Sequence, residues 1–178
     1  LRRREHAAPT AGEVLRTLDP VGTENHPLTC DAIITYCRQP VMRRSPYAGM
    51  LFNGQGRPVG MDRNAPTLTA SMGGNKTPII DENALYNGAL NFAEVYHSSI
   101  FQSGEIRRGQ APDHLRRMTV KEAAALQTFP KDYVFSGPTT AQYRQIGNAM
   151  PVALATEVAD VVAYLLDTYV TAGSQNKN

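Results

Sequence analysis

The side chains in this sequence best suited to metal binding or redox chemistry are two cysteines and four histidines. Cys30 and Cys37 lie in a segment whose pattern predicts a helix, and seven positions of helix separate residues by about 10 Å, too far for a disulfide. The chain has no Cys-x-x-Cys pair, and its histidines are scattered at positions 6, 26, 97 and 114. The sequence therefore predicts neither a disulfide framework nor a zinc site, and we expect no metal.

The basic residues are unevenly distributed along the chain. The net charge of the 178 residues is only +2, so the overall charge does not indicate a nucleic-acid partner. Between Arg43 and Lys76, however, five basic residues are opposed by Asp62 alone. This excess suits a surface that faces an anion, although a solvated basic face gives the same pattern.

Composition and length indicate a soluble protein with a core. The chain is 42% hydrophobic, enough for one globular domain or two small ones. Arg2, Arg3 and Arg4 are followed by no apolar run, so we expect no signal peptide. The run Val152–Leu166 contains two acids and is shorter than the roughly 20 residues of a membrane span. We expect a cytoplasmic protein without a membrane partner.

Local signals predict two helices in the first 40 residues. Thr10 and Glu13 form a capping box that should open a helix ending near Leu18. Thr29 can cap a second helix, which Pro40 would end.

The middle of the chain is rich in glycine and proline from Pro46 to Pro78. It should form loops and short strands, predicted at Tyr47–Phe52, Thr67–Ser71 and Ile79–Ile80. We expect partial helix from Asp81 to Ile100, and a polar linker from Gln102 to His114.

The last third has the clearest helical signals. Thr119 and Glu122 form a second capping box, and Pro130 ends the helix that it opens. A short helical turn should precede Gly147, and Pro151 is well placed in the first turn of a final helix.

Two ordered motifs connect this sequence with a known family. The segments Arg117–Pro130 and Tyr143–Pro151 strongly resemble the last two motifs of DNA cytosine-5 methyltransferases, with matching spacing and a matching Phe135–Gly137 between them. Upstream, Asn64–Ser71 and Gly73–Lys76 resemble the target-recognition region of that family.

The resemblance implies the C-terminal part of such an enzyme, which is an α+β fragment. Residues 1–115 would form an irregular target-recognition domain of short strands and loops, with a linker. Residues 116–178 would carry the C-terminal motifs and a helix that returns to a Rossmann-like catalytic domain. The implied reaction transfers a methyl group from S-adenosylmethionine to carbon 5 of a flipped cytosine in duplex DNA.

The catalytic motifs of the family are missing from this sequence. Its nucleophile is a cysteine in a Pro-Cys motif, but Thr29 precedes Cys30 and Tyr36 precedes Cys37. The Glu-Asn-Val motif and the Phe-x-Gly-x-Gly cofactor loop are also missing. We therefore assign no catalytic residue and expect the chain alone to be inactive.

The resemblance assigns a cofactor role to the second of the two motifs. Asn148, flanked by Gly147 and Ala149, would approach S-adenosylmethionine, with Ala149 contributing backbone at most. The alternative is that Gly147 and Asn148 simply form a turn before the final helix. Arg117, which we expect to pair with Glu122, and Gln127 would support the recognition region.

The recognition region supplies the candidate DNA contacts. They are polar or flexible residues that suit phosphates, base edges or close backbone approach, namely Arg57, Arg63, Thr67, Thr69, Gly73, Gly74, Asn75 and Lys76. A solvated loop is the alternative for each of them.

Two other roles compete with that of an enzyme part. The chain could be a noncatalytic DNA-binding subunit of a split restriction-modification methyltransferase, or an inert fragment. In either case the apolar side of the final helix would bind a catalytic partner or a second copy of the chain.

Overall fold

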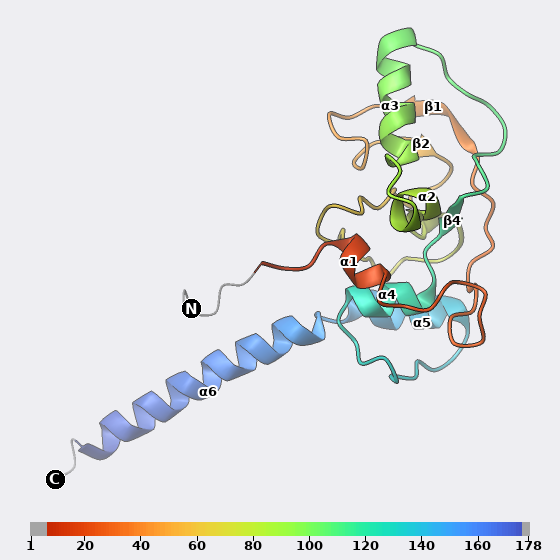
Figure 1. Cartoon of the computed structure of the whole chain (residues 1–178). Helices are drawn as coiled ribbons and strands as arrows, with labels where there is room; N and C mark the ends of the chain where they lie inside the picture. The colour runs from red at the N-terminus through yellow and green to blue at the C-terminus, as the bar shows by residue number, and fades with distance from the viewer. Residues whose placement is uncertain (1–6, 176–178) are drawn as a thin grey trace.

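The strands of this protein form two separate antiparallel pairs. In the computed structural model, which describes residues 7–175, β1 (Tyr36–Val41) pairs with β2 (Met50–Phe52). β3 (Ile79–Asp81) pairs with β4 (Leu115–Arg117). Together with the helices, these short pairs make a small α+β body (Figure 1). Arg2, Arg3, Arg4 and His6 lie outside the described residues.

Short helices surround the strand pairs. They are α1 (Ala11–Leu15), the single 3₁₀ turn η2 (Gly74–Lys76), α2 (Glu82–Tyr86), α3 (Phe92–Ser103), α4 (Val120–Leu126) and α5 (Thr139–Asn148). α4 packs against both α1 and α5.

Two hydrophobic clusters meet at β3. Because successive side chains of a strand point to opposite faces, Ile80 enters the cluster under α1, α4 and α5, which includes Met118 and Tyr143. Ile79 enters the cluster between α3 and the β1–β2 pair, which includes Phe52 and Tyr96. The body therefore has buried cores of its own, which hold the loops described below in place.

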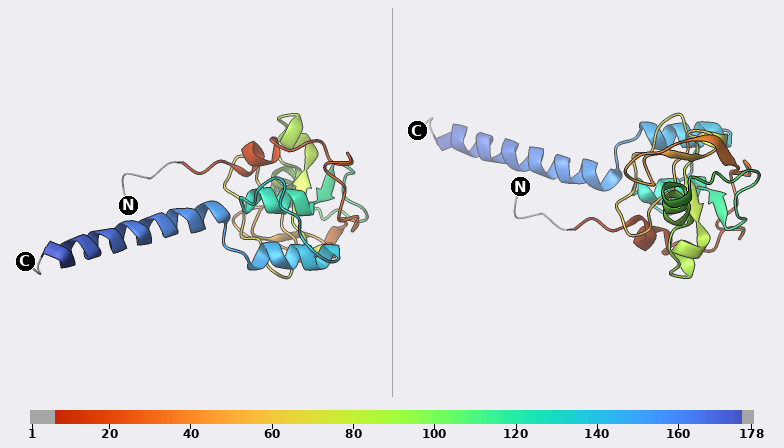
Figure 2. Two further views of the ribbon diagram at one scale, coloured as in Figure 1. Left: turned by 90° about the horizontal axis from the view of Figure 1, so that it is seen from below. Right: turned by 90° about the horizontal axis from the view of Figure 1, so that it is seen from above.

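α6 (Val152–Gln175) projects away from this body, as Figures 1 and 2 show from three directions. Its beginning is attached to the body through hydrogen bonds from the backbone of Val152 to the Gln127 carbonyl and from that of Ala153 to the Thr128 hydroxyl. Its apolar side chains are exposed, including Val158, Val162 and Leu166.

α6 is longer than the apolar run Val152–Leu166, so the expectation that this region is too short to span a membrane was wrong. α6 has 24 residues, and by length and composition alone it could cross a membrane. The most apolar stretch of this helix is not buried against the rest of the protein. One such helix is weak evidence for a membrane, because a helix that packs into the core of a soluble protein has the same composition.

Both predicted capping boxes are confirmed. Both capping boxes form, Thr10 with Glu13 at α1 and Thr119 with Glu122 at α4. The partial helix expected from Asp81 to Ile100 forms as α2 and α3, which a break after Tyr86 separates, and the strand at Ile79–Ile80 is β3.

The helix predicted after Thr29 is wrong. The segment to Ile34 is irregular, and β1 follows it, because the backbone at Tyr36 bonds the Gly109 carbonyl and Thr35 bridges Gln110. Cys30 and Cys37 therefore do not share a helix. Both are free thiols.

The strand predicted at Thr67–Ser71 does not form either. This segment packs its backbone against α5 instead of pairing with another strand.

Candidate nucleic-acid and cofactor interface

A cleft forms where the end of α5 meets the segment 65–68. It has a volume of about 360 Å³. Among its lining residues are Thr67, Gln127, Gly147 and Ala149, which are far apart in the sequence. The cleft, called here the α5 cleft, thus joins one candidate DNA contact to two candidate cofactor residues.

Gly147 makes this cleft possible. A β-carbon at this position would overlap the carbonyl of Thr69 and the amide nitrogen of Ala70. The backbone of α5 therefore rests directly on the recognition segment, an approach that only glycine allows. Gly147 and Asn148 are the last residues of α5, so they are not the turn that the sequence offered as an alternative.

The wall of the α5 cleft contains an unpaired polar group, and a strained residue follows it in the chain. The amide oxygen of Gln127 is buried and has no hydrogen-bond partner among the described residues. Thr128 has a φ of 57°, an unusual conformation for a β-branched residue. Asn148 is exposed beside them and offers a carboxamide that can both donate and accept. These groups suit contact with a polar ligand.

A second group of candidates gathers where two loops cross. The amide of Gly56 donates to the Asn75 carbonyl at 3.0 Å, and a β-carbon on Gly56 would overlap the Thr77 carbonyl. This crossing brings Arg57 close to the η2 loop, in which Gly74, Asn75 and Lys76 are exposed. Gly73 borders the loop, where a β-carbon would lie 3.4 Å from the Thr140 methyl group on α5.

Arg117 holds this crossing together from beneath. The side chain is 1% exposed, and its guanidinium donates to the Thr77 carbonyl at 2.9 Å and to the side-chain oxygen of Asn53 at 2.9 Å. Burial lowers the pKa of Arg117. The residue therefore positions the two loops by binding oxygens that carry no full charge.

The ion pair expected between Arg117 and Glu122 is wrong, because Arg116 occupies that role. Its guanidinium binds both oxygens of Glu122, at 2.8 and 2.7 Å, and Glu82 at 2.7 Å. Neighbouring residues of β4 point to opposite faces, so only one of the two arginines can reach α4. Burial alone would lower the pKa of Arg116, but its bonds to Glu122 and Glu82 and their charges raise it.

Two candidate DNA contacts have other neighbours. Arg63 lies with its guanidinium 5.0 Å from the centre of the Tyr47 ring and 3.8 Å from the Asp62 carboxylate. The exposed Thr69 hydroxyl lies 3.1 Å from that of Ser71. Arg63 thus contacts residues that lie outside both groups.

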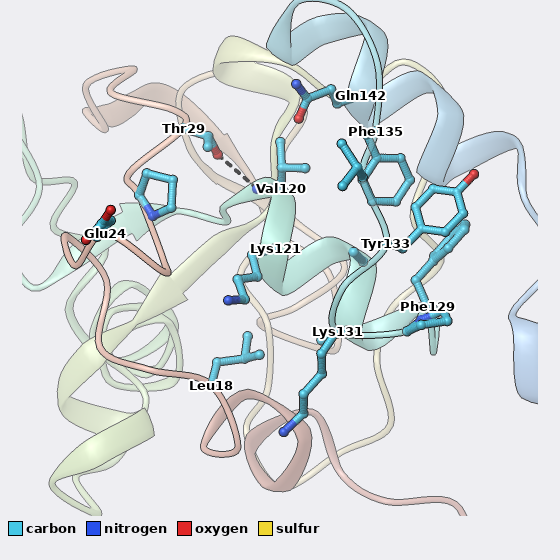
Figure 3. Close-up of a pocket in the computed structure, with 15 residues that line it drawn as sticks. Leu18, Glu24, Thr29, Val120, Lys121, Phe129, Lys131, Tyr133, Phe135 and Gln142 are labelled. Atoms are coloured by element: carbon cyan, nitrogen blue, oxygen red, sulfur yellow. Dashed lines mark hydrogen bonds between the residues drawn. The ribbon is translucent and has the colours of Figure 1, made fainter.

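A further cavity, called here the aromatic cavity, has none of the predicted site residues in its lining. It has a volume of about 570 Å³ and lies between the segment 18–29 and α4 with the loop that follows (Figure 3). Phe129, Tyr133 and Phe135 form one wall, with ring centres 4.7 to 5.0 Å apart. The only sequence signal for it was the run of aromatic residues after Pro130. Its lining suits an apolar group rather than catalysis.

Comparison with known proteins identifies the family. Residues 38–163, more than half of the chain, match the model of the C-5 cytosine-specific DNA methylase family. The chain belongs to this family. Type II methyltransferase M.BsuRI of Bacillus subtilis is 31% identical over 146 residues, which are 72% of this chain and 30% of that protein.

Other C-5 methylase relatives match shorter segments. Type II methyltransferase M1.HphI of Haemophilus parahaemolyticus is 38% identical over 93 residues, 51% of this chain and 25% of the relative. M.Eco47II of Escherichia coli is 52% identical over 56 residues, 32% of this chain and 13% of the relative. The chain therefore spans less than a third of the length of each of these relatives. The family acts on DNA and uses S-adenosylmethionine.

Proposed function

We propose that this chain is the C-terminal, DNA-recognition part of a cytosine-5 methyltransferase of a restriction-modification system. The supporting observation is the contact of Gly147 with the backbone of Thr69 and Ala70. It joins the motif that resembles the family's cofactor motif to the segment that resembles its recognition region. A methyl donor and a target base must meet in one active site, so such a junction is what this function requires.

The cofactor would contact this chain at the end of α5. Asn148 is exposed, while Gly147 and Ala149 line the α5 cleft, where Gln127 has an unpaired amide oxygen. An exposed carboxamide and a buried acceptor fit the amino and hydroxyl donors of S-adenosylmethionine. The cofactor supplies the methyl group, and these residues would hold and orient it as one wall of a site completed by a catalytic domain.

Duplex DNA would contact the exposed side of the loops that flank this cleft. Thr67 and Thr69 can bond the sugar–phosphate backbone, and Gly73 and Gly74 allow close approach. Arg57, Asn75 and Lys76 gather at the loop crossing, and Arg63 adds a charge beside Tyr47. Arg57 and Asn75 can read base edges, whereas Lys76 acts mainly as a charge near phosphate.

The chain alone should transfer no methyl group. The buried Cys30 thiol donates weakly to the Gly74 carbonyl at 3.7 Å, and that of Cys37 donates to the Gln39 carbonyl at 3.3 Å. Neither follows a proline, so neither matches the nucleophile of the family. The catalytic domain would come from another part of the protein or from a separate subunit, acting in the cytoplasm.

Binding of a labelled duplex to the 178-residue chain tests this proposal. Lys76→Ala should weaken binding and flatten its salt dependence, whereas Asn75→Ala should cost about 1–3 kcal/mol of discrimination at one base pair. Lys131→Gln removes a charge from the wall of the aromatic cavity, and serves as the matched control. If changes at Arg57, Arg63, Asn75 and Lys76 leave affinity and sequence preference untouched, these loops do not read DNA.

Methyl transfer provides the second measurement. Tritiated S-adenosylmethionine and cytosine-rich duplexes should give no incorporation with the pure chain. Turnover that disappears in Cys30→Ala or Cys37→Ala would refute the assignment of this chain to the noncatalytic part.

A further inference from the structure

Three arginines surround a hollow that lies outside the loops described so far. Arg38 comes from β1, and Arg107 and Arg108 come from the linker between α3 and β4. The remaining lining residues are Thr35, Tyr36 and Gly109, and the volume is about 480 Å³. Within the described part of the chain, no acidic residue lines this hollow, called here the arginine hollow. All three arginines are exposed to solvent.

Backbone contacts hold the two sides of the arginine hollow together. The Tyr36 amide donates to the Gly109 carbonyl at 3.0 Å, and Thr35 forms a bridge with Gln110. Gly109 has a φ of 87°, which lets the linker turn beside β1 (Figure 1). The arginines of the linker are therefore placed opposite Arg38 by the fold.

Aromatic rings position Arg107. Its guanidinium lies 5.6 Å from the centre of the Phe92 ring and 5.8 Å from that of Tyr96. Its amide also donates to the Tyr96 hydroxyl at 3.2 Å. Stacking of this kind fixes a guanidinium without neutralising its charge, so the charge remains available to an anion.

The arginine hollow is connected directly to the candidate DNA-binding loops. Thr35 in its wall exchanges two hydrogen bonds with Asn53, at 3.1 and 2.9 Å. The Asn53 amide group in turn donates to the side-chain oxygen of Asn75 in the η2 loop at 3.4 Å. One asparagine thus connects the hollow with the loop that carries Asn75 and Lys76.

We infer that the arginine hollow binds a backbone phosphate of the DNA whose bases face the η2 loop. This inference rests on the proposed function and adds to it a phosphate site that fixes the register of the duplex. Guanidinium groups bind phosphate oxygens through paired hydrogen bonds, and such contacts position a protein on DNA without reading its sequence. Because no acidic residue lines the described part of the hollow, its three arginines suit an anion that comes from another molecule.

The double variant Arg38→Gln/Arg108→Gln tests the inference and avoids the ring contacts of Arg107. Binding of a mixed-sequence duplex is measured between about 50 and 200 mM salt, where each lost phosphate contact lowers the log–log slope by about 0.9. We expect a loss of about one such step, with sequence preference unchanged. Arg38→Lys/Arg108→Lys should retain most of the slope, because lysine keeps the charge.

The controls separate this inference from the proposed function. If the wild-type chain binds no DNA, both fail. If Lys76→Ala flattens the slope but the double Gln variant matches Lys131→Gln, only the inference about the hollow fails. Inorganic phosphate whose binding is lost in the double Gln variant but is not displaced by the duplex would show a site for a free anion, and would overturn the assignment to DNA.

Discussion

Arg116 of β4 pairs with one buried and one half-exposed carboxylate. This difference predicts that the two ion pairs contribute unequally to the free energy of unfolding. Glu122 is 1% exposed and its charge is balanced mainly by Arg116. In Arg116→Ala the carboxylate would remain buried without a counter-charge, so the free energy of unfolding should fall by about 3–5 kcal/mol. Urea denaturation measures it. Glu82→Ala removes the half-exposed partner of the same arginine and should cost at most about 1 kcal/mol. Equal losses would contradict the dominance of Glu122.

A second prediction at this scale concerns Gly147. The added methyl group in Gly147→Ala would overlap the backbone at Thr69 and Ala70, which cannot rotate away as a side chain can. We expect a loss of about 1–3 kcal/mol of stability and a weaker affinity for DNA, because the recognition segment must move off α5. Asn148→Ala, at the exposed neighbouring position, should change stability by less than about 0.5 kcal/mol. If Gly147→Ala is as stable as Asn148→Ala, the close approach is not required.

At the scale of elements, the start of α4 depends on a buried histidine. His26 Nδ1 lies 2.6 Å from the Asp19 carbonyl, which can only accept, so Nδ1 carries the proton of the neutral ring. Nε2 then accepts from the Thr119 hydroxyl at 2.7 Å, while that hydroxyl accepts from the Glu122 amide at 3.1 Å. Thr119 thus caps α4 and binds His26 with a single side chain.

Thr119→Ala should therefore cost more than the loss of an ordinary cap. A lost cap accounts for about 1 kcal/mol, and the unpaired buried ring nitrogen of His26 adds about 1–3 kcal/mol. Thr10→Ala at α1 removes an exposed capping box of the same type and should cost only the first amount. Thermal and urea unfolding of both variants, with Thr119→Ser as the conservative replacement, gives the comparison. Equal costs for Thr10→Ala and Thr119→Ala would contradict the role of His26.

For several sequence predictions, the outcome depended on how far apart the interacting residues lie in the chain. The capping boxes at Thr10 and Thr119 involve residues three positions apart, so the sequence alone revealed them. β1 was mistaken for a helix because its pairing partners are near residues 52 and 109, and no local pattern encodes them.

The candidate site followed the same rule. Motif resemblance singled out Gly147 and Thr67, but not the contact between α5 and the recognition segment. The wrong partner was chosen for Glu122 because no strand was predicted at Leu115–Arg117, so the alternation of Arg116 and Arg117 was not considered. The arginine hollow was missed because its two sides, which carry Arg38 and Arg107, lie about 70 residues apart in the sequence.

On the scale of the whole molecule, α6 differs from everything else. Among the residues of α6 whose side chains are described, none belongs to the two hydrophobic clusters of the body. Val158, Val162 and Leu166 remain 49%, 49% and 60% exposed. Burial of one such side chain is worth about 1.5–3 kcal/mol, so several of them in water favour association strongly. We expect the isolated chain to self-associate through α6, or to bind a catalytic partner there.

Val162→Glu tests this expectation, because it places a charge in the middle of the exposed apolar side of α6. The apparent mass of the chain, measured by light scattering over a range of concentrations, should rise for the wild type and much less for Val162→Glu. Asn148→Ala should leave association unchanged and impair methyl transfer only when a catalytic partner is present, since Asn148 lies at the end of α5 and not on α6. A chain that stays monomeric at high concentration and is indifferent to Val162→Glu would mean that this surface needs no partner, and the role given to α6 would then be wrong.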